Sequence, residues 1–338
     1  MKKTRIAING FGRIGRISFR KLLHIANIEI VAINDLADIK TLAHLLKYDS
    51  TYGVFSKAIT IAEKDAQLFI DGHTIQVISE PNLIDLPWET LQVDIVIEAT
   101  GQFLDYASIA KHLEAGAKKV IVSAPAKSVP TIVLGINDHI LPTAGPIISN
   151  ASCTTNCLAP LVQVLDENFG IEKGFMTTIH AYTTDQRLQD APHKDLRRAR
   201  AAAHAIIPTT TGAAKTIGVV LPHLQGKLDG IAVRVPVLDG SMVDFTALLQ
   251  QSTTKEQINA AMKKAADSSL KGLLAYTEDP IVSVDVIGNP HSCIFDAGLT
   301  YTQENLVKVI GWYDNEGGYA QRIVDLVEKI SKEWECSK

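Results

Sequence analysis

One cysteine near the middle of the 338-residue chain stands among hydroxyl and amide side chains. The run reads Ser149-Asn150-Ala151-Ser152-Cys153-Thr154-Thr155-Asn156-Cys157. A free cysteine most often packs in a protein core, but these neighbours are poor material for an apolar pocket. Hydroxyl and amide groups suit hydrogen bonds to an oxyanion or a phosphate. The pattern therefore favours a chemical role for Cys153.

The residues on either side of this run predict where Cys153 lies in the fold. A strand-like apolar run at 146–148 precedes it, and apolar positions at Leu158, Leu161, Val162 and Leu165 follow at helical spacing. Cys153 is thus predicted at a helix N-terminus, where unpaired N–H groups stabilise a thiolate, and we expect a lowered pKa. Cys157 is expected to pack inward on the same helix. No second Cys or His pair stands at ligand spacing, so no metal site is expected.

A histidine provides a second chemical group. His180 lies in a predicted strand, residues 174–182, and a long polar segment from Thr183 to His204 follows. Three hypotheses arise. Cys153 attacks an aldehyde, His180 handles the proton and hydride passes to a nicotinamide; or the pair serves a hydrolase or amidotransferase; or the chain is a nucleotide-binding module with an inert cysteine.

A glycine-rich motif near the N-terminus indicates a nucleotide site. The predicted strand 5–9 leads into Gly10-Phe11-Gly12-Arg13-Ile14-Gly15 and then into a helical pattern. In this context G-x-G-x-x-G lets the backbone approach a pyrophosphate at a helix N-terminus. Asp35 follows Gly15 by 20 residues at the end of the next strand, where a carboxylate binds ribose hydroxyls and repels a 2′-phosphate. We therefore expect NAD rather than NADP.

The order of the elements predicts the fold class. Strands and helices alternate up to about residue 150, including strand-like runs at 94–98, 119–125, 131–134 and 147–149, which predicts a Rossmann-type parallel sheet. Ser123, at a strand end, is a candidate cofactor contact. We expect an NAD-binding domain at 1–152, with a C-terminal helix at 318–338 packing back on it. Residues 153–317 are expected to form an α+β catalytic domain with a mixed or antiparallel sheet.

Composition narrows the class of protein further. The net charge of −4 is spread along the chain, which does not indicate binding to nucleic acid or to an acidic membrane surface. Four cysteines without framework spacing point to a reducing compartment. No signal peptide or membrane-spanning run is evident. We expect a soluble cytoplasmic protein.

Several motifs together resemble one family. Asn9–Arg16, Ser149–Pro160, Thr210–Lys215 and Trp312–Glu316 are similar to phosphorylating, bacterial-type glyceraldehyde-3-phosphate dehydrogenase, and the resemblance covers essentially the whole chain. It implies oxidation of glyceraldehyde 3-phosphate with NAD and inorganic phosphate, through a cysteine hemithioacetal and thioester, to 1,3-bisphosphoglycerate in glycolysis or gluconeogenesis. It also implies a homotetramer.

The resemblance assigns roles to particular residues. Cys153 is the nucleophile, and His180 activates the thiol and stabilises the oxyanion. The two phosphate pockets are assigned to Ser152, Thr154, Thr183, Arg198, Thr211, Gly212 and Arg234. The cofactor contacts are Gly10, Gly12, Arg13, Ile14, Asp35, Ser123 and Asn315.

A rival within the fold and several departures bear on these expectations. Erythrose-4-phosphate dehydrogenase hydrolyses its thioester with water and usually lacks the sequences found here at Thr211–Lys215 and Tyr182-Thr183. Ala191-Pro192 stands where NAD-only members usually have Leu-Pro and NADP-tolerant members Ala-Ser, so limited use of NADP is expected. Ser79-Glu80-Pro81 replaces a segment with an arginine near the adenosine, and Gly317-Gly318 replaces a larger residue after Glu316.

Overall fold

The computed structural model describes residues 3–336, which divide into two compact units. The first unit comprises Met1–Ile132, His139–Ala151 and Ala320–Lys338, and the second comprises Val133–Asp138 and Ser152–Tyr319. One unit contains a mostly parallel sheet and the other a mixed sheet, so the predicted fold class is confirmed. The predicted domain boundaries at 152 and 317 stay a prediction.

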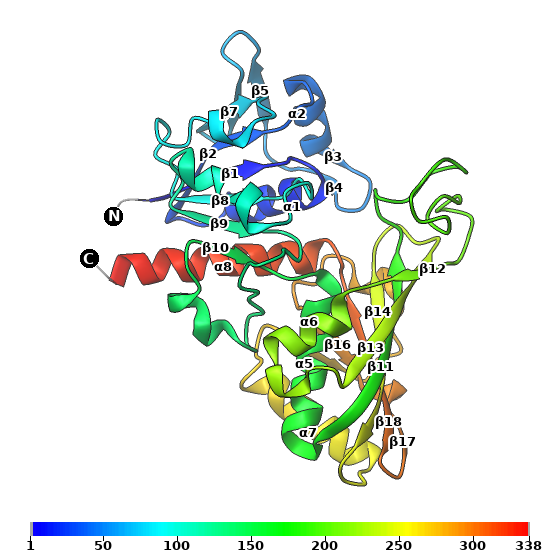
Figure 1. The fold of residues 1–338 in the computed structure, drawn as a ribbon. Helices are drawn as coiled ribbons and strands as arrows, with labels where there is room; N and C mark the ends of the chain where they lie inside the picture. Colours follow the sequence, from blue (N-terminus) through cyan, green and yellow to red (C-terminus); the bar gives the residue numbers. More distant parts are fainter. Residues whose placement is uncertain (1–2, 337–338) are drawn as a thin grey trace. The chain divides into compact units, whose positions relative to one another are not determined.

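The first unit is built on an eight-stranded sheet in the order β10-β9-β8-β1-β2-β7-β6-β5 (Figure 1). Six strands are parallel, and the antiparallel hairpin strands β5 and β6 extend one edge. The strands are β1 (Thr4–Asn9), β2 (Ile28–Asn34), β5 (Ile59–Ala62), β6 (Gln67–Ile70), β7 (His73–Ile78), β8 (Ile95–Glu98), β9 (Lys119–Val122) and β10 (Ile147–Ser149). The chain leaves β1 toward β2 and returns on its other side as β8. This change of direction places a ligand crevice at the carboxyl ends of β1 and β8.

Helix α1 (Arg13–Leu22) follows β1, α2 (Ile39–Lys47) follows β2, and α3 (Tyr106–Ile109) and α4 (Lys111–Glu114) follow β8. The last helix of the chain, α8 (Gly317–Cys336), belongs to this unit from Ala320 onward. The side chains of Ile6, Ile8 and Ile97 in the central strands are fully buried, as expected for a parallel sheet covered on both faces. The shorter elements are β3 (Tyr48–Asp49), β4 (Gly53–Val54), η1 (Leu83–Asp85) and η2 (Asp138–Thr143).

The second unit contains a sheet in the order β12-β13-β11-β14-β18-β16-β15, with β17 paired to β18. Its strands are β11 (Ile171–Ala181), β12 (Ile207–Thr210), β13 (Leu228–Val235), β14 (Ser241–Leu249), β15 (Leu274–Thr277), β16 (Cys293–Asp296), β17 (Tyr301–Gln303) and β18 (Leu306–Tyr313). Three helices, α5 (Cys153–Phe169), α6 (Ala213–Val220) and α7 (Lys255–Asp267), lie on one face of the sheet (Figure 1). Short 3-10 turns complete it: η3 (Pro222–Leu224), η4 (Ser283–Val286) and η5 (Ala297–Leu299).

One predicted strand differs from the structure. The strand predicted at 131–134 is only a single bridge from Thr131 to Ser149, because the chain turns after Val133, whose carbonyl oxygen accepts the N–H groups of Ile136 at 3.1 Å and Asn137 at 3.2 Å. The helical segment between β8 and β9 is divided into α3 and α4. Helix α6 begins only at Ala213, because the β-branched residues Thr209 and Thr210 pair with β13.

Candidate active site

Cys153 is the first residue of α5, as predicted. Ser152 caps the helix, since its backbone is extended and its Oγ accepts the N–H of Thr155 at 3.1 Å. Cys153 itself is half-buried, and Cys157, one turn later, is fully buried, which confirms its predicted packing role. The sulfur therefore lies beside backbone N–H groups that no earlier turn of the helix can use.

His180 lies next to this sulfur. The distance from Cys153 Sγ to His180 Nε2 is 3.4 Å. The other ring nitrogen, Nδ1, is 2.7 Å from the carbonyl oxygen of Ala181, to which it donates when it carries the proton. In that tautomer the lone pair of Nε2 faces the thiol, and the thiol proton can pass to the imidazole.

Arg234 is the third member of the cluster. The parallel register of β11 and β13 places it opposite His180, and its Nη1 lies 2.8 Å from His180 Nδ1 and 3.0 Å from the oxygen of Ala181. The guanidinium can only donate: with the ring proton on Nδ1, Arg234 and the Nδ1–H share the carbonyl oxygen, and with the ring proton on Nε2, Nδ1 accepts from Arg234. A full positive charge therefore stands beside the cysteine–histidine pair.

The surroundings of Cys153 contradict the prediction that its pKa is lowered. Protein packed around the sulfur raises the pKa of the Cys153 thiol, although Arg234 and the hydrogen bonds of Thr154 act in the opposite direction. The predicted lowering of this pKa is wrong, because loss of water around the thiolate outweighs the helix N-terminus and the nearby charge. Burial, assisted by the charge of Arg234, lowers the pKa of His180 to about 3. The pair thus rests as a neutral thiol beside a neutral imidazole.

The low pKa of His180 predicts a pH dependence of stability. The unfolded chain binds a proton near the ordinary pKa of 6.5 and the folded chain only near 3, so the free energy of unfolding falls as pH falls through this window and is unaffected above it. Between pH 6.5 and 5 the native protein should lose about 1–2 kcal/mol relative to a His180→Asn variant. Urea unfolding of both proteins at several pH values measures this. Parallel pH profiles would contradict it.

A buried tyrosine that the sequence analysis did not assign supports the site. The hydroxyl of Tyr313 lies 2.9 Å from Thr154 Oγ1 and 2.8 Å from Thr178 Oγ1, and its ring meets His180 edge-on with centroids 5.9 Å apart. Burial raises the pKa of Tyr313 well above its usual range, so the hydroxyl stays neutral. The sequence signal that could have indicated it is its position two residues before Asn315, within the run Trp312–Glu316.

The structure divides the predicted phosphate residues into two groups. Ser152, Thr154 and Arg234 surround Cys153 and His180. The second group comprises Thr183, Arg198, Thr211 and Gly212. Arg198 Nε donates to Thr209 at 2.9 Å, which places the guanidinium beside the strand that leads directly to Thr211 and Gly212.

An unpredicted carboxylate belongs to the second group. Asp185 accepts hydrogen bonds from the hydroxyl of Thr183 and from the guanidinium of Arg198. A phosphate that binds both residues must compete with this carboxylate for their donors. Asp185 therefore holds the two side chains in place while reducing the net positive charge.

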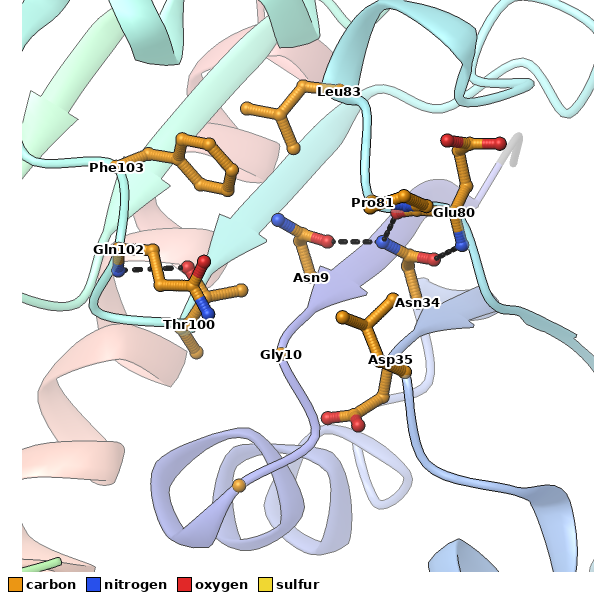
Figure 2. Close-up of a pocket in the computed structure, with 13 residues that line it drawn as sticks. Asn9, Gly10, Asn34, Asp35, Glu80, Pro81, Leu83, Thr100, Gln102 and Phe103 are labelled. Atoms are coloured by element: carbon orange, nitrogen blue, oxygen red, sulfur yellow. Dashed lines mark hydrogen bonds between the residues drawn. The ribbon is translucent and has the colours of Figure 1, made fainter.

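A cavity of about 270 Å³ lies at the carboxyl ends of β1, β2 and β8 in the first unit (Figure 2). Gly10 has a φ of +88°, and a Cβ there would come within 2.6 Å of the backbone nitrogen of Thr100, so glycine is required. Asp35 is fixed at the edge by N–H groups of Phe11 at 2.7 Å and Ala37 at 3.0 Å. Gly12 is the N-cap of α1 and makes no side-chain cap hydrogen bond, and a helix N-terminus is where an anion is stabilised.

The predicted cofactor residues occupy different places. Gly10, Gly12 and Asp35 line the cavity, and Ile14 is in the first turn of α1. Arg13 Nη1 pairs with Asp49 at 2.6 Å, so its guanidinium is held by a carboxylate of the protein. The N–H of Ser123 donates to the carbonyl oxygen of Glu98 at 2.9 Å. Asn315 is in the second unit, where its Oδ1 accepts from Ser241 at 2.6 Å.

Two features of residues 3–336 bear on other classes of protein. Among the described residues, no group of three or more His, Cys, Asp and Glu side chains could hold a metal ion. In the same part of the chain, every helix is too short or too polar to cross a membrane.

A Rossmann-type sheet with a glycine-lined cavity, in one chain with a cysteine–histidine pair at a helix N-terminus, is typical of dehydrogenases with a reactive cysteine. The NAD binding domain model of glyceraldehyde 3-phosphate dehydrogenase matches residues 4–106, and the C-terminal domain model matches residues 152–315. The chain belongs to the glyceraldehyde 3-phosphate dehydrogenase family. The match to the NAD binding domain confirms NAD as the predicted cofactor.

Individual relatives cover nearly the whole chain. A glyceraldehyde-3-phosphate dehydrogenase of Streptomyces coelicolor is 60% identical over 95% of this chain and 97% of its own length. Proteins of the same name from Borreliella burgdorferi and Geobacillus stearothermophilus are 56% and 54% identical, each over 97% of this chain and over 100% and 98% of their own lengths.

Proposed function

We propose that this protein oxidises glyceraldehyde 3-phosphate with NAD and inorganic phosphate to 1,3-bisphosphoglycerate. One observation carries the proposal: Cys153, at the N-terminus of α5, has its Sγ 3.4 Å from Nε2 of the neutral His180, in a chain with an NAD-binding domain. A neutral imidazole is the form that can take the thiol proton.

The proposed reaction begins with attack of Cys153 Sγ on the aldehyde carbon while the thiol proton passes to His180 Nε2. The backbone N–H of Cys153 and the imidazolium stabilise the oxyanion, and the proton then gives the hemithioacetal hydroxyl. That proton returns to Nε2 when the hemithioacetal is oxidised to the thioester. NAD, when bound, accepts the hydride.

Inorganic phosphate completes the proposed cycle. A phosphate oxygen attacks the thioester carbon, the bond to Cys153 breaks, and the thiolate recovers its proton from His180. The charge of Arg234 beside the imidazole favours an incoming anion, the Thr154 hydroxyl lies beside the sulfur, and Ser152 directly precedes Cys153 as the helix cap. Thr183, Arg198, Thr211 and Gly212 form the second anion site.

The proposal extends to organisation. Residues 1–152 with the helix at 318–338 form the NAD-binding domain, and 153–317 form the catalytic domain. Gly10, Gly12, Asp35, Ser123, Asn315 and the backbone of Arg13 and Ile14 contact the cofactor, with limited use of NADP. The protein acts in the cytoplasm as a homotetramer; sedimentation velocity tests the oligomeric state.

An absorbance assay of NADH formation tests the activity. Purified protein with glyceraldehyde 3-phosphate and NAD should form NADH at a rate that depends on inorganic phosphate, and erythrose 4-phosphate should be the poorer substrate. Undiminished turnover without phosphate would overturn the proposal in favour of thioester hydrolysis by water.

Replacing Arg234 should weaken phosphate use. Arg234→Leu removes a guanidinium 2.8 Å from His180 Nδ1, and we expect the KM for inorganic phosphate to rise about 10-fold or more. It also removes a charge that lowers the pKa of His180, so the acid limb of the pH–rate profile should move to higher pH. Arg200→Leu, an exposed site, is the control. An unchanged phosphate KM would exclude Arg234 from the anion site.

A further inference from the structure

A buried carboxylate in the first unit, that of Glu98, does not line the cavity but is hydrogen-bonded to Asn9 and Thr100, which do. Glu98, at the carboxyl end of β8, is 1% exposed. Four donors converge on it: Asn9 Nδ2 at 2.5 Å, His112 Nε2 at 3.0 Å, the N–H of Thr100 at 2.8 Å and the hydroxyl of Thr100. Two carboxylate oxygens offer about four lone-pair sites. Glu98 is therefore saturated as an acceptor.

Trp88, at the end of this hydrogen-bond network farthest from the cavity, determines which groups donate and which accept. The indole N–H of Trp88 can only donate, and it donates to His112 Nδ1 at 3.0 Å. The ring proton of a neutral His112 must then be on Nε2, which donates to Glu98. Both Trp88 and His112 are 0% exposed, so the tautomer is set by protein groups.

The near end of the network reaches the cavity. Asn9, with its amide nitrogen bound to Glu98, presents Oδ1 to Asn34 Nδ2 at 2.7 Å. Asn34 in turn donates to the carbonyl of Glu80 and accepts its N–H, each at 2.9 Å (Figure 2). Every donor faces an acceptor, so both amide orientations follow from the hydrogen bonds.

These hydrogen bonds connect the carboxyl ends of the three strands that form the cavity. Asn9, Asn34 and Thr100 line it and lie at the carboxyl ends of β1, β2 and β8. Glu98 binds the first and third directly and the second through Asn9. We propose that Glu98, oriented by His112 and Trp88, is a positioning residue for NAD: it contacts no cofactor but holds Asn9 and Thr100 in the binding geometry. This rests on the proposed placement of NAD in this cavity.

Glu98→Gln tests the proposal, because any orientation of the new amide turns an NH₂ group toward existing donors. We expect the Kd of NAD, measured by isothermal titration calorimetry, to rise about tenfold. The KM for NAD should rise in parallel, while kcat at saturating NAD stays within about twofold. Asp94→Asn is the matched control: Asp94 is a buried acid beside the opposite end of β8, bound to the N–H of Arg5 at 2.9 Å. It should leave the Kd within about twofold.

A second pair of variants separates hydrogen bonding from packing. In His112→Gln one amide can accept from Trp88 and donate to Glu98, whereas His112→Leu keeps the volume without either bond. We expect near-native NAD affinity in the first and a several-fold weaker Kd in the second. If Glu98→Gln does not fold, this pair of variants still tests whether the hydrogen bonds from Trp88 through His112 to Glu98 determine the affinity for NAD.

The NAD affinities of these variants distinguish the positioning role of Glu98 from the assignment of the cavity as the NAD site. Asp35→Ala should weaken NAD binding if the cavity is the NAD site; an unchanged Kd there would overturn the cavity assignment. A weakened Asp35→Ala combined with native affinity in Glu98→Gln, or in both His112 variants, would overturn the positioning role alone. Equal losses in Glu98→Gln and Asp94→Asn would show a general effect of destabilisation and also overturn it.

Discussion

Cys153→Ser is expected to lower kcat/KM by at least about 10⁴-fold, because a serine hydroxyl beside His180 is a far weaker nucleophile and its ester is a different intermediate from a thioester. The substitution keeps the size of the side chain and the N-terminus of α5, so the fold should persist. Stopped-flow measurement of NADH formation in a single turnover tests the chemical step directly.

The affinity for NAD should not follow the loss of activity. The predicted contacts with the pyrophosphate and ribose lie in the first unit, at the cavity lined by Gly10 and Asp35, so the Kd of NAD should change by less than about twofold. Cys157→Ala, on the same helix and fully buried, is the control and should keep turnover at reduced stability. A Cys153→Ser enzyme with even one-tenth of native activity would remove the cysteine from the mechanism.

His180→Asn is expected to lower kcat by about 10²–10⁴-fold, the usual contribution of a positioned general base. The shorter amide can still donate to the oxygen of Ala181, but it has no nitrogen at the position of Nε2, which lies 3.4 Å from the sulfur. The raised pKa of Cys153 makes this loss larger, because the thiol does not ionise unaided at neutral pH.

The pH profile and a control give this prediction its test. If the imidazole is the base, raising the pH should partly restore the rate of His180→Asn, as hydroxide generates thiolate directly. His223→Asn changes an exposed histidine paired with Asp166 and should leave kcat unchanged. A His180→Asn rate within threefold of native at neutral pH would assign proton transfer to another group.

Local sequence patterns predicted the helices and strands that position the reactive residues. The pKa values and some side-chain contacts of the site depend on tertiary packing, which these patterns do not reveal. The strand–glycine–helix pattern around Gly10 and the hydroxyl-rich entry to α5 depend on nearby residues, and both form where expected. The pKa of Cys153 depends on how much protein surrounds the sulfur, which spacing along the chain does not reveal. The role of Asp185 depends equally on contacts with Arg198 across 13 residues of irregular chain.

The last helix gives the first unit a particular order of assembly. From Ala320 onward α8 belongs to that unit, and Ser331 Oγ lies 2.5 Å from Thr4 Oγ1. Nearly the whole second unit therefore leaves the ribosome before the first can acquire its final helix, so the unit that begins synthesis first matures last. Chains released before residue 320 should expose the apolar surface that Ile323, Leu326 and Ile330 cover, which makes them natural targets for chaperones and proteases.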